Sequence, residues 1–153
     1  MTFGRVGGVY ALLSAADDVA DHWGQTTRQA KNKGKAGREG QRACAAHVAT
    51  LTATRAILLA AGAAAAGERI HPGRAAAGLA LGAGLHYWAD RRTTLRGLAD
   101  RLSWAGIDAF HQVGAPRAGH DDNRCLGTGA YALDRAFHHG CRVFEAMLIA
   151  GRG

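Results

Sequence analysis

The chain has 153 residues, the usual size of one domain and long enough to bury a core. Two prolines, 7% aromatic residues and an alanine-rich sequence argue against a β-sandwich and favour helices. Lys and Arg number 19 against 12 Asp and Glu, an excess that suits anionic partners such as nucleic acid, anionic lipid or phosphorylated substrates. The three widely spaced cysteines give no disulfide framework and no zinc knuckle.

The apolar segments predict an all-α bundle of about four main helices in a single domain, residues 1–153. The predicted helices span residues 6–27, 43–66, 75–102 and 129–150. Pro72 and flanking glycines mark a turn between the second and the third. The first apolar run is cut short by Asp17 and Asp18, and no signal-peptide cleavage site clearly follows. We therefore interpret this run as the first helix and not as a signal.

Two Gly-rich segments separate the predicted helices. Residues 28–42, RQAKNKGKAGREGQR, hold six Lys and Arg against one acid, so we expect a solvated basic loop. Residues 114–129, GAPRAGHDDNRCLGTG, form a second irregular stretch. Its residues 120–123 have the composition of a turn in which Asp and Asn bond the backbone, and a loop of ligands is the alternative. We find no fixed-period repeat and no Gly-rich phosphate loop.

Hydropathy leaves open whether the bundle crosses a membrane. The segment 43–66 is long enough to span a bilayer, but Arg55 near its middle costs about 2.5–3.5 kcal/mol on insertion scales. Residues 75–89 lack Asp, Glu, Lys and Arg, which is short for a span. In a four-helix membrane bundle the basic segments 28–42 and 91–124 would both face the cytoplasm. The bacterial cytoplasmic membrane and the cytoplasm are both compatible locations.

Side chains of the types that bind metals recur at helical spacing inside the apolar segments. Residues four apart share one face of a helix, and a carboxylate and an imidazole placed so can reach one metal ion. Burying isolated charges is costly, whereas a shared cation would pair them, as in the metal centres of helix bundles. The sets with this spacing are His86 with Asp90, Asp134 with His138, and Asp17 with Asp21 and Gln25, beside the single His47.

This order of residues resembles an uncharacterised bacterial family of small polytopic membrane proteins. In that family HxxxDFxxQ and a later Lys belong to the first helix, a lone His opens the second, HxxxD closes the third and DQxxH lies in the last. The matching residues here are Asp21, Gln25, Lys31, His47, His86, Asp90, Asp134 and His138. The chain departs from the pattern at Asp17, His22 and Arg135, where the family has His, Phe and Gln. The family's activity is unestablished, and its layout is similar to that of proteins assigned as membrane-associated metal-dependent hydrolases.

The first functional hypothesis is a membrane-associated, metal-dependent hydrolase. Mixed Asp and His ligands suit Zn²⁺, Mn²⁺ or Fe²⁺, which lower the pKa of bound water so that it can attack a phosphoester. Asp17 would be a further ligand or the general base, and Gln25 would orient a ligand or the water. The basic loop 28–42 would gather an anionic substrate such as a lipid phosphate or a nucleotide. The predicted metal ligands are Asp21, His47, His86, Asp90, Asp134 and His138.

Two other classes of function stay open from the sequence. One is a basic helical module that binds nucleic acid or anionic lipid without catalysis, through the basic loop and the arginines within residues 91–101. No DNA-reading signature accompanies these arginines. The other is a structural membrane protein, closely packed through Gly and Ala faces, in which His and Asp form a metal-free network. The sequence does not give the oligomeric state.

Overall fold

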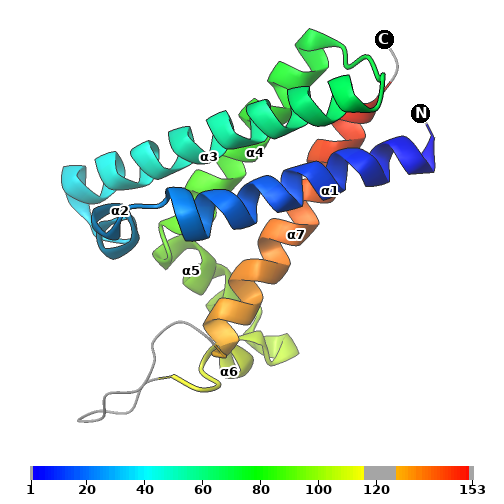
Figure 1. The fold of residues 1–153 in the computed structure, drawn as a ribbon. Helices are drawn as coiled ribbons and strands as arrows, with labels where there is room; N and C mark the ends of the chain where they lie inside the picture. Colours follow the sequence, from blue (N-terminus) through cyan, green and yellow to red (C-terminus); the bar gives the residue numbers. More distant parts are fainter. Residues whose placement is uncertain (1, 116–126, 152–153) are drawn as a thin grey trace.

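The computed structural model describes residues 2–115 and 127–151, which fold into helices (Figure 1). No strand occurs in these described residues, so the predicted all-α fold is confirmed. The elements are α1 (Phe3–Val19), the π-helix η1 (Ala20–Gly24), α2 (Thr27–Asn32), α3 (Gly37–Ala65), α4 (Pro72–Asp90), α5 (Thr93–Arg101), the 3-10 helix η2 (Ser103–Ala105), α6 (Ile107–His111) and α7 (Gly129–Ala150).

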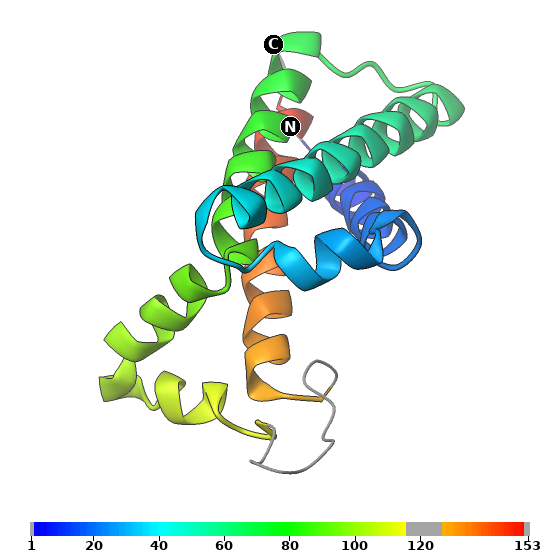
Figure 2. The ribbon, with the colours of Figure 1, turned by 90° about the vertical axis from the view of Figure 1, so that its left-hand side faces the viewer.

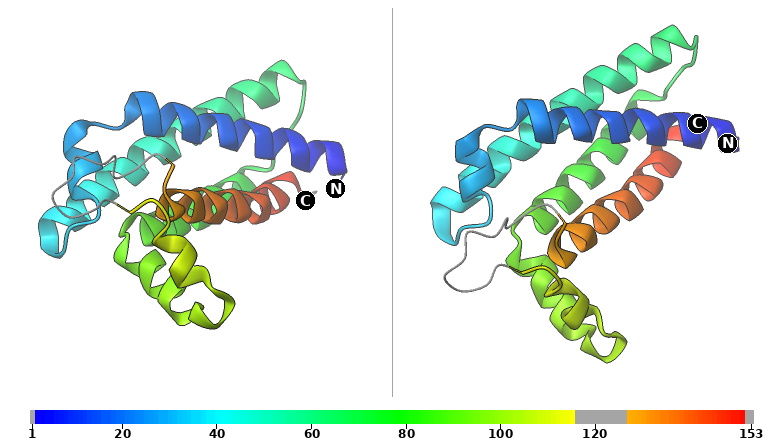
Figure 3. Two further views of the ribbon diagram at one scale, coloured as in Figure 1. Left: turned by 90° about the horizontal axis from the view of Figure 1, so that it is seen from below. Right: turned by 60° about the horizontal axis from the view of Figure 1, so that its bottom comes forward.

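The four long helices α1, α3, α4 and α7 form the bundle. Helices α1 and α4 each pack against both α3 and α7. Figures 1 and 3 place the two termini at one end, near the connection between α3 and α4, and we call this the terminal end. The C-terminal ends of α1 and α4 and the N-terminal ends of α3 and α7 form the opposite end, which α2 and α5 adjoin. We call this the basic end.

The predicted basic loop over residues 28–42 is wrong, because most of the segment is helical. Thr26 begins α2 with a capping box, in which its hydroxyl accepts from the Gln29 backbone and its own N–H donates to the Gln29 side chain. Helix α3 begins at Gly37, so only residues 33–36 separate the two helices. A short connection of this kind holds its side chains close to the bundle.

The predicted third helix, residues 75–102, is broken in the structure. Helix α4 ends at Asp90, and Arg92 has a φ of 57°, which an α-helix does not allow. The chain then leaves the bundle through α5, η2 and α6 (Figure 2). Of the predicted Gly-rich loop 114–129 only the two ends are described, and the expected turn at residues 120–123 lies outside the described residues.

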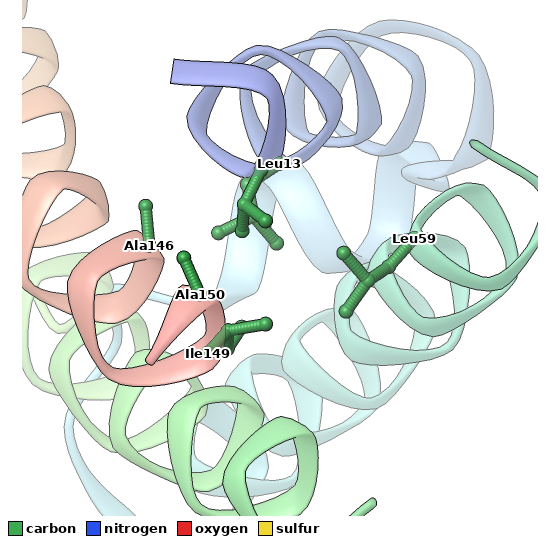
Figure 4. Packing of buried hydrophobic residues seen from close by; sticks show 6 residues of the cluster. Leu13, Leu59, Ala146, Ile149 and Ala150 are labelled. Carbon is green, nitrogen blue, oxygen red and sulfur yellow. The ribbon is translucent and has the colours of Figure 1, made fainter. Parts of the chain in front are cut away.

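The apolar core occupies the terminal end of the bundle. It joins α1, α3 and α7, and Figure 4 shows Leu13, Leu59 and Ile149 directed into the space between these helices. Small residues of α4 complete it, because a Cβ on Gly78 would lie 2.4 Å from Cγ1 of Ile149. The buried members of this core are Val9, Leu13, Leu59, Ala146, Ile149 and Ala150.

We predict opposite effects for two alanine substitutions in α4. A Cβ on Gly82 would lie 2.2 Å from Oε2 of Glu145, so Gly82→Ala should lower the free energy of unfolding by about 1–3 kcal/mol through overpacking. A Cβ on Gly84 meets nothing within 4 Å, so Gly84→Ala should raise it by about 0.5–1 kcal/mol through helix propensity. Denaturant unfolding measures both. Equal effects would contradict the close approach at Gly82.

Candidate metal centre

Three histidines from three helices meet inside the basic end. His47 of α3 belongs to a buried face that also carries Cys44 and Leu51, at the three- and four-residue spacing of one helical stripe. Nε2 of His47 lies 3.3 Å from Nε2 of His86 in α4. The rings of His86 and His138, the latter from α7, have centroids 4.2 Å apart. All three side chains are buried, so the imidazoles face one another and not solvent.

Two carboxylates reach the same point. Oδ1 of Asp21, in the π-helical turn η1, lies 3.1 Å from Nε2 of His47. Oδ2 of Asp90 lies 3.2 Å from Nε2 of His47 and 3.3 Å from Nε2 of His86. The last residue of α4 and a π-turn of the kind that recurs at functional sites thus supply the negative charge.

Two buried imidazole nitrogens of this cluster, Nδ1 of His86 and Nε2 of His138, have no hydrogen-bond partner within the described part of the chain. The buried oxygens Oδ1 of Asp21 and Oδ2 of Asp90 are contacted by His47, and Oδ2 of Asp90 also by Lys33. Buried polar atoms ordinarily find partners, because leaving one unsatisfied costs about 1–3 kcal/mol. A set of such atoms in one place is therefore the signature expected of a ligand site.

Two overlapping groups of residues could hold a metal ion. The atoms of each group that could act as ligands lie within 4.8 Å of one another, and the groups share His86. Imidazole and carboxylate ligands together suit first-row divalent ions. The groups are Asp21 with His47 and His86, and His86 with Asp90 and His138.

Neighbouring groups orient two of the imidazoles. Nδ1 of His138 donates to the backbone oxygen of Asp134 at 2.8 Å, which leaves Nε2 unprotonated in the neutral ring. Nε2 of the Gln25 amide lies 3.0 Å from Nδ1 of His47, so in this orientation the amide donates to Nδ1 and the neutral ring carries its proton on Nε2. Metal binding through Nε2 requires the amide to turn so that its oxygen accepts from Nδ1. Gln25 therefore lies beside a candidate ligand, and its role in orienting a ligand or the water stays a prediction.

Asp134 is not brought into either ligand group. Its Oδ2 lies 3.6 Å from Nδ1 of His138, beyond a good hydrogen bond, and its side chain is 40% exposed. The backbone of Asp134, and not its carboxylate, makes the contact that matters for the centre. The predicted role of Asp134 as a metal ligand is therefore corrected to a supporting position behind His138.

A lysine that the sequence did not single out completes the centre. Nζ of Lys33 lies 3.0 Å from Oδ2 of Asp90, and its side chain is 13% exposed. Arg91 donates to the backbone oxygens of Lys33 and Lys35 and so holds the connection that carries this lysine. The family pattern pointed to Lys31, which is exposed. Lys33 was missed because a Lys- and Gly-rich stretch has the composition of a solvated loop.

The charge of Asp21 is stabilised by this environment. Burial would raise the pKa of the Asp21 carboxyl group, but the hydrogen-bonding contact with His47 and the positive charges of His86 and Lys33 act against burial. The result is a pKa below the ordinary value, so Asp21 is ionised at neutral pH. An ionised carboxylate is the form that binds a metal ion.

Asp17 lies in a different cluster, which corrects its predicted role as a ligand or general base. The guanidinium group of Arg55 donates to Oδ1 of Asp17 at 2.6 Å and to Oδ2 at 2.8 Å. Arg142 also donates to Oδ2 of Asp17, and Arg55 donates to Oε2 of Glu145 at 2.9 Å. All four side chains are buried. Both oxygens of Asp17 are thus engaged by arginines, and neither is directed to the histidines.

The remaining departures from the family pattern do not enter the centre. Nη1 of Arg135 lies 3.2 Å from the Tyr131 hydroxyl and 3.8 Å from Oδ1 of Asp18, and its side chain is 40% exposed. His22 is exposed, and its ring contacts the backbone oxygen of Asp18. The additional cation at position 135 therefore lies outside the ligand groups.

Comparisons of the chain with models of protein families, with curated proteins and with solved structures found no match. The chemistry of the site therefore rests on its own geometry. Buried imidazoles and ionised carboxylates, gathered from separate helical segments around unsatisfied atoms, can bind a cation.

We predict that Arg55 is required for stability. Replacing it with Met would leave Asp17 and Glu145 buried without their shared cation, so the free energy of unfolding should fall by about 3–5 kcal/mol. Denaturant unfolding in mild detergent measures the change. Arg38→Met, on the exposed start of α3, is the control and should change it by less than about 0.5 kcal/mol. Equal stability of the two variants would contradict the role of Arg55.

Proposed function

We propose that the protein is a membrane-associated hydrolase that binds a divalent metal ion, Zn²⁺, Mn²⁺ or Fe²⁺, and acts on an anionic phosphoester. The observation that carries the proposal is the convergence of three buried imidazoles and two carboxylates, among which Nδ1 of His86 and Nε2 of His138 lack hydrogen-bond partners within the described residues. The proposed ligands are Asp21, His47, His86, Asp90 and His138.

Each group of the centre has a task in this proposal. A bound divalent ion would supply a hydroxide-like water near neutral pH and would polarise the phosphoester. The two carboxylates, Asp21 and Asp90, balance the charge of the ion. Gln25 fixes the ring of His47 through Nδ1, and the Asp134 backbone fixes the ring of His138. Helix-borne imidazoles held in this way keep their geometry when a substrate arrives.

The charge around the basic end supports an anionic substrate. Exposed arginines and lysines of α2 and the start of α3 surround the side of the bundle on which the centre lies. A field of one sign raises the local concentration of an anion and speeds its association. The exposed basic residues of these segments are Arg28, Lys31, Lys35, Arg38 and Arg42.

The distribution of apolar side chains supports membrane association. Among the described helices, α3 is the one long and apolar enough to cross a bilayer, and 22% of its most apolar window is buried, whereas the core helix of a soluble protein is mostly buried. Ile57 of α3 is 66% exposed and Phe144 of α7 is 67% exposed. Exposed large apolar side chains on the outside and charge pairs inside are the arrangement expected of a bundle in lipid.

The tryptophans fit the same arrangement. All three, Trp23, Trp88 and Trp104, are exposed. Trp23 lies in η1 and Trp88 in the last turn of α4, so both stand at the basic end, and Trp104 lies in η2 on the segment that follows. Tryptophan is enriched where a membrane meets water, and Lys and Arg favour the cytoplasmic side. We place the basic end at the cytoplasmic interface.

A structural, metal-free role is the second candidate, and one observation favours it. Lys33 already forms an ion pair with Asp90 without a metal ion. In that case chelators would leave the melting temperature unchanged, whereas a bound ion stabilises the folded protein by mass action. A nucleic-acid-binding module is the third candidate, and salt-titrated binding to DNA, RNA and anionic liposomes tests it.

We predict that His86 is needed for the metal, because His86 belongs to both ligand groups. His86→Ala should lose most of the bound metal and with it any phosphoesterase activity. Elemental analysis of gently purified protein measures the metal, and p-nitrophenyl phosphate reports the activity. The control is His71→Ala, an exposed histidine before α4, which should keep both. Full metal content in His86→Ala would show that His86 is not a metal ligand.

We predict that the exposed face of α3 contacts lipid. An aspartate near the middle of a membrane-spanning helix costs about 2.5–3.5 kcal/mol, so Ile57→Asp should reduce the membrane-bound fraction, whereas a water-exposed position would tolerate it. Alkaline carbonate extraction and flotation measure that fraction. Gln41→Asp, exposed at the basic end of the same helix, serves as the control and should remain membrane-bound. Extraction of the wild-type protein into buffer without detergent would refute the membrane location.

A further inference from the structure

We propose that Lys33 binds the anionic oxygen of a compact phosphate-type ligand at the metal centre. In the structure the same ammonium group lies 3.0 Å from Oδ2 of Asp90. The inference rests on the proposed metal binding and extends it, because it assigns a specific residue to recognition of the anion.

The first observation that supports this role is the position of the Lys33 ammonium group. Oδ2 of Asp90 is approached by Nζ of Lys33 at 3.0 Å, and by Nε2 of His47 and His86 at 3.2 and 3.3 Å. The lysine therefore stands at the same carboxylate oxygen as two proposed metal ligands. Its side chain keeps 13% exposure against 5% for Asp90, so Lys33 approaches the centre from the solvent side.

The second argument is the balance of charge among the carboxylates, Lys33 and a bound metal ion. Asp21 and Asp90 bring two negative charges to a buried place, and Lys33 provides a positive one. A divalent ion on these carboxylates would supply two positive charges and would remove the electrostatic reason for Lys33 to contact Asp90. Two cations at hydrogen-bond distances from one oxygen also repel each other. An anion that lies between the ion and the ammonium group relieves this repulsion, and lysine is a common point-charge partner of phosphate.

The backbone around Lys33 keeps the side chain within reach after it leaves Asp90. Arg91 donates to the backbone oxygen of Lys33 at 3.0 Å, and Arg92 donates to that of Ala30 at 3.4 Å. A Cβ on Gly34 would lie 2.7 Å from Cδ of Arg92, so this glycine lets the connection pack closely on Arg92. The backbone is thus held while the four-carbon stem of the lysine can turn.

Lys33 contacts its carboxylate in a different way from Arg55, which is a buried structural cation. Arg55 makes two hydrogen bonds to Asp17, and both side chains are 1% exposed. Lys33 makes one contact through a flexible side chain that is partly exposed. Bidentate, fully buried arginines suit permanent ion pairs, whereas a single lysine contact at the solvent side can be exchanged for another anion.

The test compares Lys33→Met with Lys31→Met, which removes the same charge from an exposed neighbour. Each detergent-purified protein is loaded with Mn²⁺, its metal content is measured by elemental analysis, and inorganic phosphate binding is followed by the paramagnetic relaxation of its ³¹P signal. We expect Lys33→Met to keep its manganese and to bind phosphate at least tenfold more weakly. Lys31→Met removes one charge of the surrounding basic field but no contact with the centre, so it should weaken phosphate binding by less than twofold. Lys33→Gln, which keeps a hydrogen-bond donor for Asp90 without the charge, should show the same loss and serves if the Met variant does not fold.

Two results would overturn the inference, and they can be told apart. Phosphate affinity in manganese-loaded Lys33→Met equal to that of Lys31→Met removes the role of Lys33 but leaves the metal centre. A wild-type protein that takes up no manganese, zinc or iron removes the metal centre itself, and this inference with it.

Discussion

The ion pairs of Arg55 fix how the four long helices align along the bundle. Arg55 comes from α3, its partners Asp17 and Glu145 come from α1 and α7, and Gly82 of α4 lies directly against the pair. An unpaired charge in this place would cost several kcal/mol, so none of the helices can slide by a turn without a large penalty. Each proposed histidine or aspartate ligand of these helices then lies about one or two turns from this level, toward the basic end. The relevant steps are Asp17 to Asp21, Arg55 to His47, Gly82 to His86 and Arg142 to His138.

This alignment divides the bundle into three layers with different chemistry. The terminal end holds the apolar core, and the middle holds two arginines against two acids, a balance that needs no further ion. The basic end holds the imidazoles, Asp21 and Asp90, with Lys33 as the cation contributed from outside the helices. Balanced charges already partnered by bidentate hydrogen bonds have little affinity for a ligand. Among the described residues, the groups of carboxylates and imidazoles close enough together to hold a metal ion lie in the layer at the basic end.

The sequence predicted which kinds of residue line the candidate centre better than it predicted which of these residues lie together. Spacing of four residues put His86 and Asp90 on one helical face, and these two do lie together with His47. The same spacing placed Asp17 and Asp21 on one helical face. Residues on one face still differ in their position along the helix axis, and Asp17, one turn from Asp21, pairs with Arg55 and not with the histidines. The apolar runs predicted where the long helices lie, but they did not predict where the chain leaves a helix. The capping box at Thr26 and the positive φ of Arg92 depend on local geometry that composition does not reveal.

The position of Asp90 at a helix end explains why its carboxylate needs a positive partner. Asp90 is the last residue of α4, where the unpaired carbonyl groups already carry partial negative charge, so its carboxylate is electrostatically unfavourable without a positive partner. Lys33 is the C-terminal cap of α2, and Asp21 lies in the π-helix η1. The histidines, by contrast, stand within α3, α4 and α7 and are held by packing. Under the proposed metal binding, the Lys33 ammonium group and a metal ion would compete for the same oxygen of Asp90, because the histidines around it are held by helix packing and the lysine side chain is flexible.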